Sequence, residues 1–224
     1  NRDDIRVVSE APGDAFVSAF GTKLSQDVMQ RASIKPGERY FLYVGGFGPH
    51  KNLQQILAVY TELRALHNSA MPKLVMVGDF ETDSFFSNHG SLVAWVEKNS
   101  LAENISFPGF VPDADLALLY ANALALLIPS KREGFGLPAV EAAAAGAPVI
   151  ATIHSPLPHV LAGGGMFVDP TDDRDLFNAM NLMITNEGQR RTFASVARAR
   201  AISLSWENSA RDLMQCFADL VPGA

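Results

Sequence analysis

Two glutamates around a glycine turn form the most chemically specific stretch of the sequence. Glu133 and Glu141 stand eight positions apart, with GFGLP (residues 134–138) between them. Carboxylates accept hydrogen bonds from hydroxyl groups, and amides at a helix start hold anions. We interpret the stretch as two hydroxyl-directed carboxylates on either side of an anion site. The alternatives are a helix-start acid at Glu141, favoured by the helix dipole, and a loop acid at Glu133 paired with Lys131 or Arg132.

The residues after the turn predict a helix made almost entirely of small side chains. Pro138 suits the first helical position, and Gly146 suits the residue just beyond the helix end. These bounds place Glu141 in the first helical turn. The alanine run at 142–145 lets the helix lie close to a sheet and hold its N-terminus rigidly.

A second candidate site is the loop VGGFGPHKN, residues 44–52. Gly45 and Gly46 permit close backbone approach, the helix that follows offers amides, and Lys51 adds a positive charge for a phosphate. The loop matches neither a Walker A motif nor a GxGxxG fingerprint. A tight structural turn explains it equally well, and His50 fits either a ligand donor or a solvated loop histidine.

A third candidate is the turn of Gly109, Phe110 and Val111, which follows a short apolar run. Its backbone groups and aromatic ring suit a flat base. A plain turn that leads into a helix explains the segment equally well.

The acidic segment DPTDDRD, residues 169–175, contains a DxD pattern at Asp173 and Asp175. Thr171 is a good N-cap, and acids in a first helical turn complement the dipole. Helix-start chemistry therefore explains the acids better than a metal does. The histidines are scattered without zinc-site spacing, so we expect no metal site and no required cofactor.

Short apolar runs alternate with helical patterns along the chain. The expected strands are 41–44, 73–77, 105–107, 123–128, 149–152 and 166–168, and the expected helices are 52–67, 85–98, 112–122, 138–145, 172–184, 188–202 and 206–220. This alternation predicts an α/β fold with a doubly wound, mostly parallel, Rossmann-like sheet. Ligands bind beyond the carboxyl ends of such strands, where all three candidate loops fall. Residues 1–20 are mostly loop-like, although Val7 and Val8 are candidates for a strand start, and we expect them to be a connection from another domain that enters the domain at 21–224.

Composition limits the class of partner. The 224 residues carry a net charge of −6, with 48% apolar and 19% charged residues, which is typical of a soluble globular protein and argues against nucleic acid. No apolar run is long enough for a transmembrane segment. A single cysteine, Cys216, fits a reducing compartment, so we expect a cytoplasmic protein.

The order of the motifs is more specific than any one of them. Over residues 5–220, the motifs follow in this order: VGG…PHKNL, LVMVGD, ISFPGFV, PSKREGFGLPAVEAAAAGAPVIAT and VDPTD. This order resembles the carboxyl-terminal, nucleotide-sugar-binding half of retaining glycosyltransferases of family 4, which have the GT-B architecture. The resemblance implies a donor sugar linked to GDP or UDP and hexosyl transfer, with mannosyl as the leading guess, to a glycan or glycolipid in polysaccharide biosynthesis. It also implies a missing N-terminal acceptor domain, with peripheral attachment to the inner face of the membrane through that domain.

The resemblance also assigns roles by position. Glu141 would bind the ribose, Glu133 would face the donor sugar, and Lys51 would hold the departing diphosphate. Glu133 and Lys51 are then the catalytic residues, and the last helix, from about 206, returns toward the first domain. The implied donor-binding residues are Gly45, Gly46, Lys51, Phe110, Val111, Glu133, Gly134, Phe135, Gly136, Leu137 and Glu141.

Two positions depart from the family pattern. Gly46 stands where the family commonly has an arginine, and His159 stands where it frequently has a glutamate. One of two diphosphate cations is therefore missing. Two explanations stay open: Lys131, Arg132 or His50 substitutes for it, or the anion relies more on backbone amides. Two alternatives remain open: a binding module that has lost catalysis, and another GT-B enzyme such as a sugar-phosphate synthase. We expect the isolated chain to lack transferase activity because half of the cleft is absent.

Overall fold

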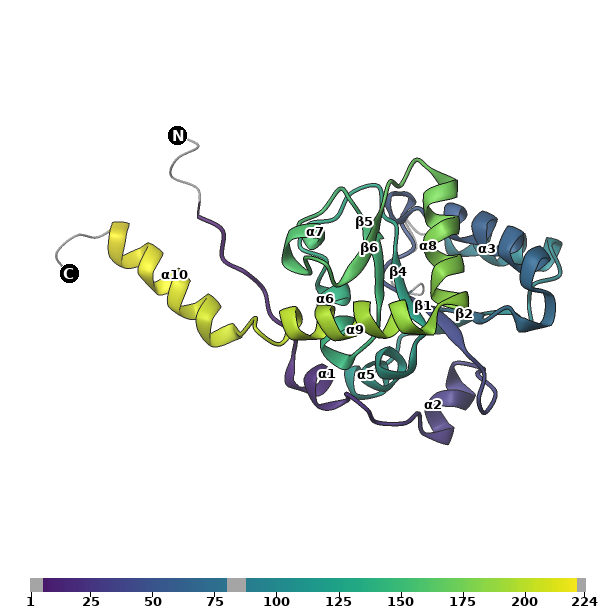
Figure 1. Ribbon diagram of the computed structural model, residues 1–224, viewed down its shortest axis with the longest axis horizontal. Helices are drawn as coiled ribbons and strands as arrows, with labels where there is room; N and C mark the ends of the chain where they lie inside the picture. Colours follow the sequence, from purple (N-terminus) through teal and green to yellow (C-terminus); the bar gives the residue numbers. More distant parts are fainter. Residues whose placement is uncertain (1–5, 80–87, 221–224) are drawn as a thin grey trace.

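The structure, a computed structural model, describes residues 6–79 and 88–220 and centres on one parallel sheet (Figure 1). The strands are β1 (Tyr40–Val44), β2 (Lys73–Val77), β3 (Ile105–Gly109), β4 (Ala125–Ile128), β5 (Val149–Thr152) and β6 (Gly165–Val168). They lie in the order β3-β2-β1-β4-β5-β6, and all five pairings are parallel. The predicted doubly wound sheet is confirmed. The order reverses between β1 and β4, and a crevice opens at such a point.

Helices cover both faces of the sheet. The α-helices are α1 (Asp14–Ser18), α2 (Gln26–Arg31), α3 (Leu53–His67), α4 (His89–Lys98), α5 (Asp113–Asn122), α6 (Leu137–Ala145), α7 (Leu157–Val160), α8 (Asp173–Thr185), α9 (Glu187–Ala201) and α10 (Trp206–Leu220). Buried residues of α3, α4 and α8 share one hydrophobic cluster, and those of α1, α2, α5, α6 and α9 share the other. Figure 1 shows α3 and α8 on the right of the sheet and α5 and α6 on its other side.

The strands divide their side chains between these two clusters. In β1, Phe41 and Tyr43 belong to the cluster under α3, whereas Leu42 belongs to the one under α6. Successive residues of a strand point to opposite faces. The strands β1, β2, β4 and β5 are almost entirely buried and nearly continuously apolar in sequence, as expected for a parallel sheet covered on both faces, whereas the edge strands β3 and β6 are partly exposed.

The amino-terminal region differs from expectation. Part of the segment expected to be loop-like forms α1, which packs Phe16 edge-on against Tyr120 of α5 at 5.7 Å between ring centroids. Val7 is 88% exposed and lies outside any strand. Helices α2 and α7 were not predicted, because each has only six or four residues and too few apolar repeats to show a period. The expected helix residues 85–87 lie outside the described part of the chain.

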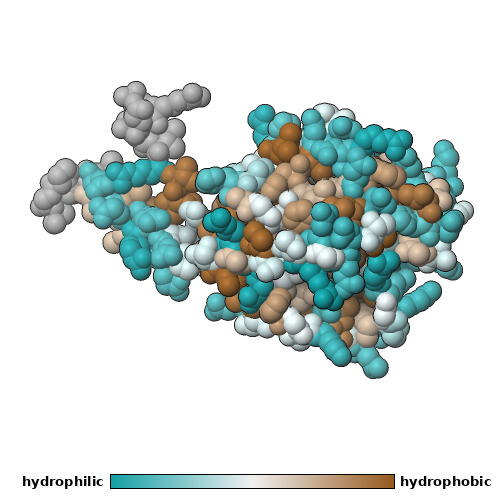
Figure 2. Space-filling model, viewed as in Figure 1, coloured by the Kyte–Doolittle hydropathy of each residue, from teal (hydrophilic) through white to brown (hydrophobic). Residues whose placement is uncertain are grey.

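The expected last helix is confirmed as α10, which projects from the domain (Figure 1). Ser209 Oγ donates a hydrogen bond of 2.6 Å to the carbonyl of Ser9, so α10 lies beside the incoming amino-terminal segment. Trp206, Met214 and Phe217 are 51%, 66% and 55% exposed, and Figure 2 shows brown, apolar side chains on this projecting arm. In residues 6–79 and 88–220, no helix has the length and apolarity that crossing a bilayer requires.

Candidate functional site

The loops after β1, β4, β5 and β6 meet at the carboxyl edge of the sheet. The amide of Lys131, after β4, donates to the carbonyl of His50, after β1, at 2.8 Å. The amide of Glu133 donates to the carbonyl of His154, after β5, at 3.2 Å. Asn52 Nδ2 bridges the carbonyls of Pro129 and Pro170 at 3.2 and 2.9 Å. Residues far apart in the sequence are thus fixed into one site.

Lys51 and Glu133 form an ion pair at the centre of this edge. Lys51 Nζ lies 2.7 Å from Glu133 Oε1, and the two side chains are only 21% and 12% exposed. Ser130 Oγ, whose residue is fully buried, donates to the same oxygen at 2.6 Å. The alternative pairing of Glu133 with Lys131 or Arg132 is wrong. Ser130 was missed from the sequence; its signal was a polar residue at the end of the apolar run LALLIP.

The glycine turn between the glutamates presents free backbone donors. Gly136 has φ +83°, and a Cβ there would lie 2.7 Å from Leu157 Cδ1, so glycine is required. No acceptor among the described residues meets the amides of Gly134, Phe135, Gly136 or Leu137. Helix α6 begins at Leu137, with Pro138 in its second position, and ends before Gly146 at φ +96°. The predicted C-terminal glycine is confirmed, and the turn can hold an anion.

Glu141 does not lie in the first turn of its helix, which contains no acid. Because α6 begins at Leu137, Glu141 falls in the second turn, where the helix dipole has little effect. Tyr120 Oη donates to its Oε2 over a long 3.4 Å. Burial raises the pKa of Glu141 to about 7, with smaller contributions from Asp113 and Glu10, while the Tyr120 hydrogen bond opposes the rise. Such a carboxyl, held beside other acids, suits a neutral hydroxyl ligand.

The loop after β1 is shaped by glycines. Gly45 has φ +147°, and its amide donates to the carbonyl of Val77 at 3.0 Å. A short 3₁₀ turn, Pro49–Lys51, then leads into α3, which starts at Leu53. Tyr43 Oη donates to the carbonyl of Gly46, and burial together with the charge of Glu133 raises the Tyr43 pKa. A Cβ on Gly46 would meet nothing within 4 Å, so a side chain can start from this position without a clash.

In the turn of Gly109, Phe110 and Val111, the candidate site for a nucleotide base, one side chain is exposed and another is buried. Gly109, at φ +76°, is the last residue of β3. The ring of Phe110 is 70% exposed, whereas Val111 is 4% exposed and belongs to the core. Only the backbone of Val111 can therefore face a ligand, while Phe110 offers a ring.

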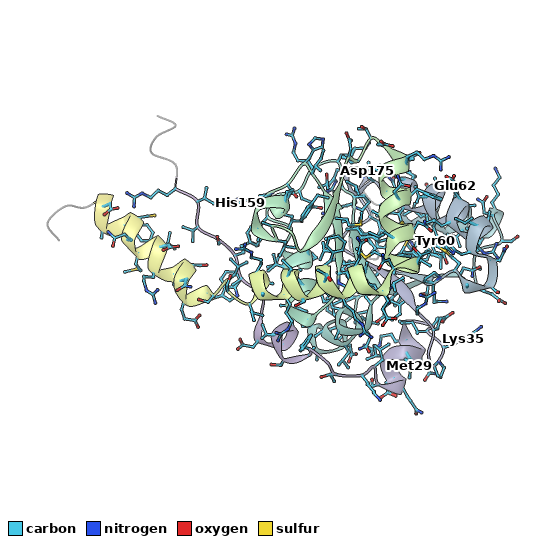
Figure 3. All side chains as sticks on the ribbon, in the orientation of Figure 1. Met29, Lys35, Tyr60, Glu62, His159 and Asp175 are labelled. Carbon is cyan, nitrogen blue, oxygen red and sulfur yellow. The ribbon has the colours of Figure 1, made fainter. Side chains whose placement is uncertain are left out.

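The DxD segment makes helix-start contacts. Asp172, not Thr171, caps α8 by accepting hydrogen bonds from the amides of Arg174 and Asp175. Asp173 accepts from Gln55, and Asp175 accepts from the amide of Asp169. Figure 3 shows Asp175 at the upper end of α8, far from Lys35 and Met29 at the opposite edge. Within the described ranges, no group of three or more histidine, cysteine or acidic side chains is arranged to hold a metal ion.

Comparison with known proteins identifies the family. Residues 25–200 match the family model described as "Glycosyl transferases group 1". The chain belongs to this glycosyltransferase family. The site above therefore lies in a glycosyltransferase fold, and the loops at the carboxyl edge of the sheet lie inside the matched region.

Individual proteins and solved structures are also similar to this chain. The O-antigen chain mannosyltransferase B of Escherichia coli is 32% identical over 186 residues, covering 80% of this chain and 45% of the relative. Sucrose-phosphate synthase from Thermosynechococcus elongatus superimposes with a TM-score of 0.78 at 26% identity, covering 96% of this chain and 52% of that one. Anabaena HepE, solved in complex with UDP, superimposes with a TM-score of 0.76 at 20% identity, covering 96% of this chain and 57% of that one. At this identity, the likeness shows the fold alone. The chain spans about half the length of these proteins.

Proposed function

We propose that this chain is the nucleotide-diphosphate-sugar-binding domain of a retaining glycosyltransferase of family 4 and the GT-B type. The observation that carries the proposal is the arrangement of the Lys51–Glu133 pair beside the free amides of residues 134–137. An ammonium group and preorganised amides next to a carboxylate match a diphosphate joined to a sugar. Hexosyl transfer to a glycan or glycolipid is the proposed reaction, and the mannosyltransferase named above supports mannose as the sugar. We propose a donor linked to GDP or UDP, with GDP-mannose as the first to test.

The site's chemistry follows from where charge develops. The departing nucleoside diphosphate gains negative charge, which Lys51 and the turn amides stabilise. Oε1 of Glu133 is occupied by Lys51 and Ser130, so its other oxygen is left to accept from a sugar hydroxyl. Glu141, in α6, accepts from the ribose diol. Phe110 offers a ring for the base. We propose that these protein groups carry the diphosphate without a DxD-bound metal.

The remainder of the active site is proposed to come from a second, acceptor-binding domain. The relatives are about twice as long as this chain, and the incoming segment and α10 leave the domain side by side. The exposed apolar residues of α10 then suit packing against that domain. We propose a cytoplasmic protein attached to the membrane peripherally through it, and an isolated chain that binds donor without transferring sugar.

Two other functions have a specific observation in their favour. Gly46 in place of the family's usual arginine favours a binding module without catalysis. Likeness to the sucrose-phosphate synthase favours a sugar-phosphate synthase. Transfer by a full-length protein, compared with its Glu133→Ala variant, separates an enzyme from a binding module, and the acceptor used separates the two enzymes.

Titration calorimetry with GDP, UDP and ADP tests the proposal, because a donor domain must bind at least one of them.

The Glu141 carboxyl, with a pKa of about 7, accepts two hydroxyls well only when ionised. The affinity for the bound ribonucleotide should therefore rise from pH 6 to pH 8. The 2′,3′-dideoxy analogue, which lacks the diol but has the same phosphates, is the control and should show a smaller rise. A folded chain that binds none of the three nucleotides would refute the proposal.

Gly46→Arg should raise the affinity for the nucleoside diphosphate about tenfold, equivalent to one added charge-assisted hydrogen bond. The position has open space, and its φ lies outside the left-handed range, so the side chain can be added without strain. Gly46→Gln, which adds length without charge, is the matched control. Equal affinities for the arginine and glutamine variants, measured by calorimetry, would contradict the idea that this position lies beside the diphosphate.

A further inference from the structure

We propose that Ser130 is a positioning residue for Glu133: its buried hydroxyl holds one carboxylate oxygen so that the other faces the donor sugar. The inference rests on the proposed function of the site. It adds a residue outside the pattern of glutamates, glycines and lysine from which the site was predicted.

The geometry around Glu133 is asymmetric. Oε1 receives both Lys51 Nζ at 2.7 Å and Ser130 Oγ at 2.6 Å. In the described part of the chain, Oε2 has no hydrogen-bond partner. A carboxylate can accept about four hydrogen bonds through its two oxygens. The protein therefore fixes one oxygen and leaves the other to a ligand.

The two groups that hold Oε1 differ in their freedom. Lys51 is a point charge on a flexible stem, and the proposed diphosphate competes with Glu133 for that charge. Ser130 is 0% exposed and lies two residues beyond the end of β4, so its short side chain has no alternative ligand to reach. When Lys51 turns to the diphosphate, Ser130 is the group that keeps the Glu133 carboxylate in place.

The different roles of Lys51 and Ser130 predict which part of the donor loses affinity when the Ser130 hydroxyl is removed. The nucleoside diphosphate contacts Lys51, the turn amides and Glu141, none of which Ser130 touches. The sugar contacts Glu133, whose orientation Ser130 sets. Loss of the hydroxyl should therefore reduce the additional affinity contributed by the sugar and spare that of the nucleotide.

The test compares the affinities of GDP-mannose and GDP for the wild-type chain, Ser130→Ala and Ser130→Thr by calorimetry. If uridine nucleotides bind more tightly, UDP-glucose and UDP take their place. In Ser130→Ala, the ratio of sugar-nucleotide to nucleotide affinity should fall about five- to tenfold, the upper part of the range for one lost hydrogen bond. The affinity for GDP alone should change less than twofold. Ser130→Thr, which keeps a hydroxyl, should restore the ratio.

Ser106→Ala is the matched control. It also removes a serine hydroxyl, one that donates to the carbonyl of Ala32 at 2.8 Å on the edge strand β3, and should leave the ratio unchanged. An unchanged ratio in Ser130→Ala, or an equal loss for GDP and GDP-mannose, would overturn the inference while leaving the proposed function standing. A wild-type chain that binds no nucleotide would instead refute the proposed function itself.

Discussion

Replacing Lys51 with alanine should weaken the binding of a nucleoside diphosphate about 10- to 100-fold. A hydrogen bond between charged groups contributes about 1.5–3 kcal/mol, and each 1.4 kcal/mol is a factor of ten. Lys51 is the cation held at the centre of the site, 2.7 Å from Glu133, and the family's usual arginine is absent at Gly46. The loss should appear in calorimetry with GDP or UDP and should be equal with and without the sugar.

Lys131→Ala is the control for this prediction. Lys131 is exposed, and its amide, not its ammonium group, joins the loops, so its loss should weaken binding less than threefold. A larger effect for Lys131 than for Lys51 would show that Lys131 replaces the missing arginine.

Lys51→Ala also leaves the Glu133 carboxylate without its cation and should lower stability. Adding Glu133→Gln should recover the stability but not the affinity, which separates the two effects.

Gly78→Ala should lower the free energy of unfolding by about 3 kcal/mol or more. This is the upper end of the range for substitutions that add atoms to a well-packed core. A Cβ at Gly78 would stand 2.1 Å from the carbonyl oxygen of Gly45 and 2.7 Å from Phe47 Cε2. The clash is with backbone, so it can be relieved only by moving the end of β2 away from the loop after β1. Thermal unfolding should shift down by about 6–12 °C for a domain of this size.

The control is Gly90→Ala. Gly90 lies in α4, and a Cβ there would meet nothing within 4 Å, so alanine should be neutral or stabilising by up to about 1 kcal/mol. Equal melting temperatures for the two variants would contradict the close approach of β2 to the Gly45 loop. A Gly78→Ala protein that folds should also bind nucleotide less tightly, because that loop carries Lys51.

Much of this fold could be predicted from local signals. Apolar runs indicated all six strands, of which β1, β2, β4 and β5 are almost entirely buried, and glycine at 146 correctly marked the end of α6. The predicted start of α6 was one residue late, because Pro138 is accepted in the second position as well as the first. That small shift moved Glu141 from the first turn into the second.

Contacts between distant segments could not be predicted in the same way. Lys51 and Glu133 are 82 residues apart, and no local pattern distinguishes this pairing from one between Glu133 and its neighbours Lys131 and Arg132. Ser130 became visible as a candidate only when its hydroxyl was seen beside Glu133. Likewise, Val111 stood in a promising turn, but its side chain belongs to the core.

The alanine-rich helix α6 has a further consequence. Its residues Ala139 and Ala142–Ala145 are at most 1% exposed, and α6 contacts α1, α5, α9, β4 and β5. Methyl groups are thus the largest side chains at these five positions. A larger residue at any of them would push the helix away from its neighbours, together with the turn amides at its start and Glu141 in its second turn. Residues that never meet the ligand should then lower ligand affinity, because they displace the start of α6 from the edge of the sheet.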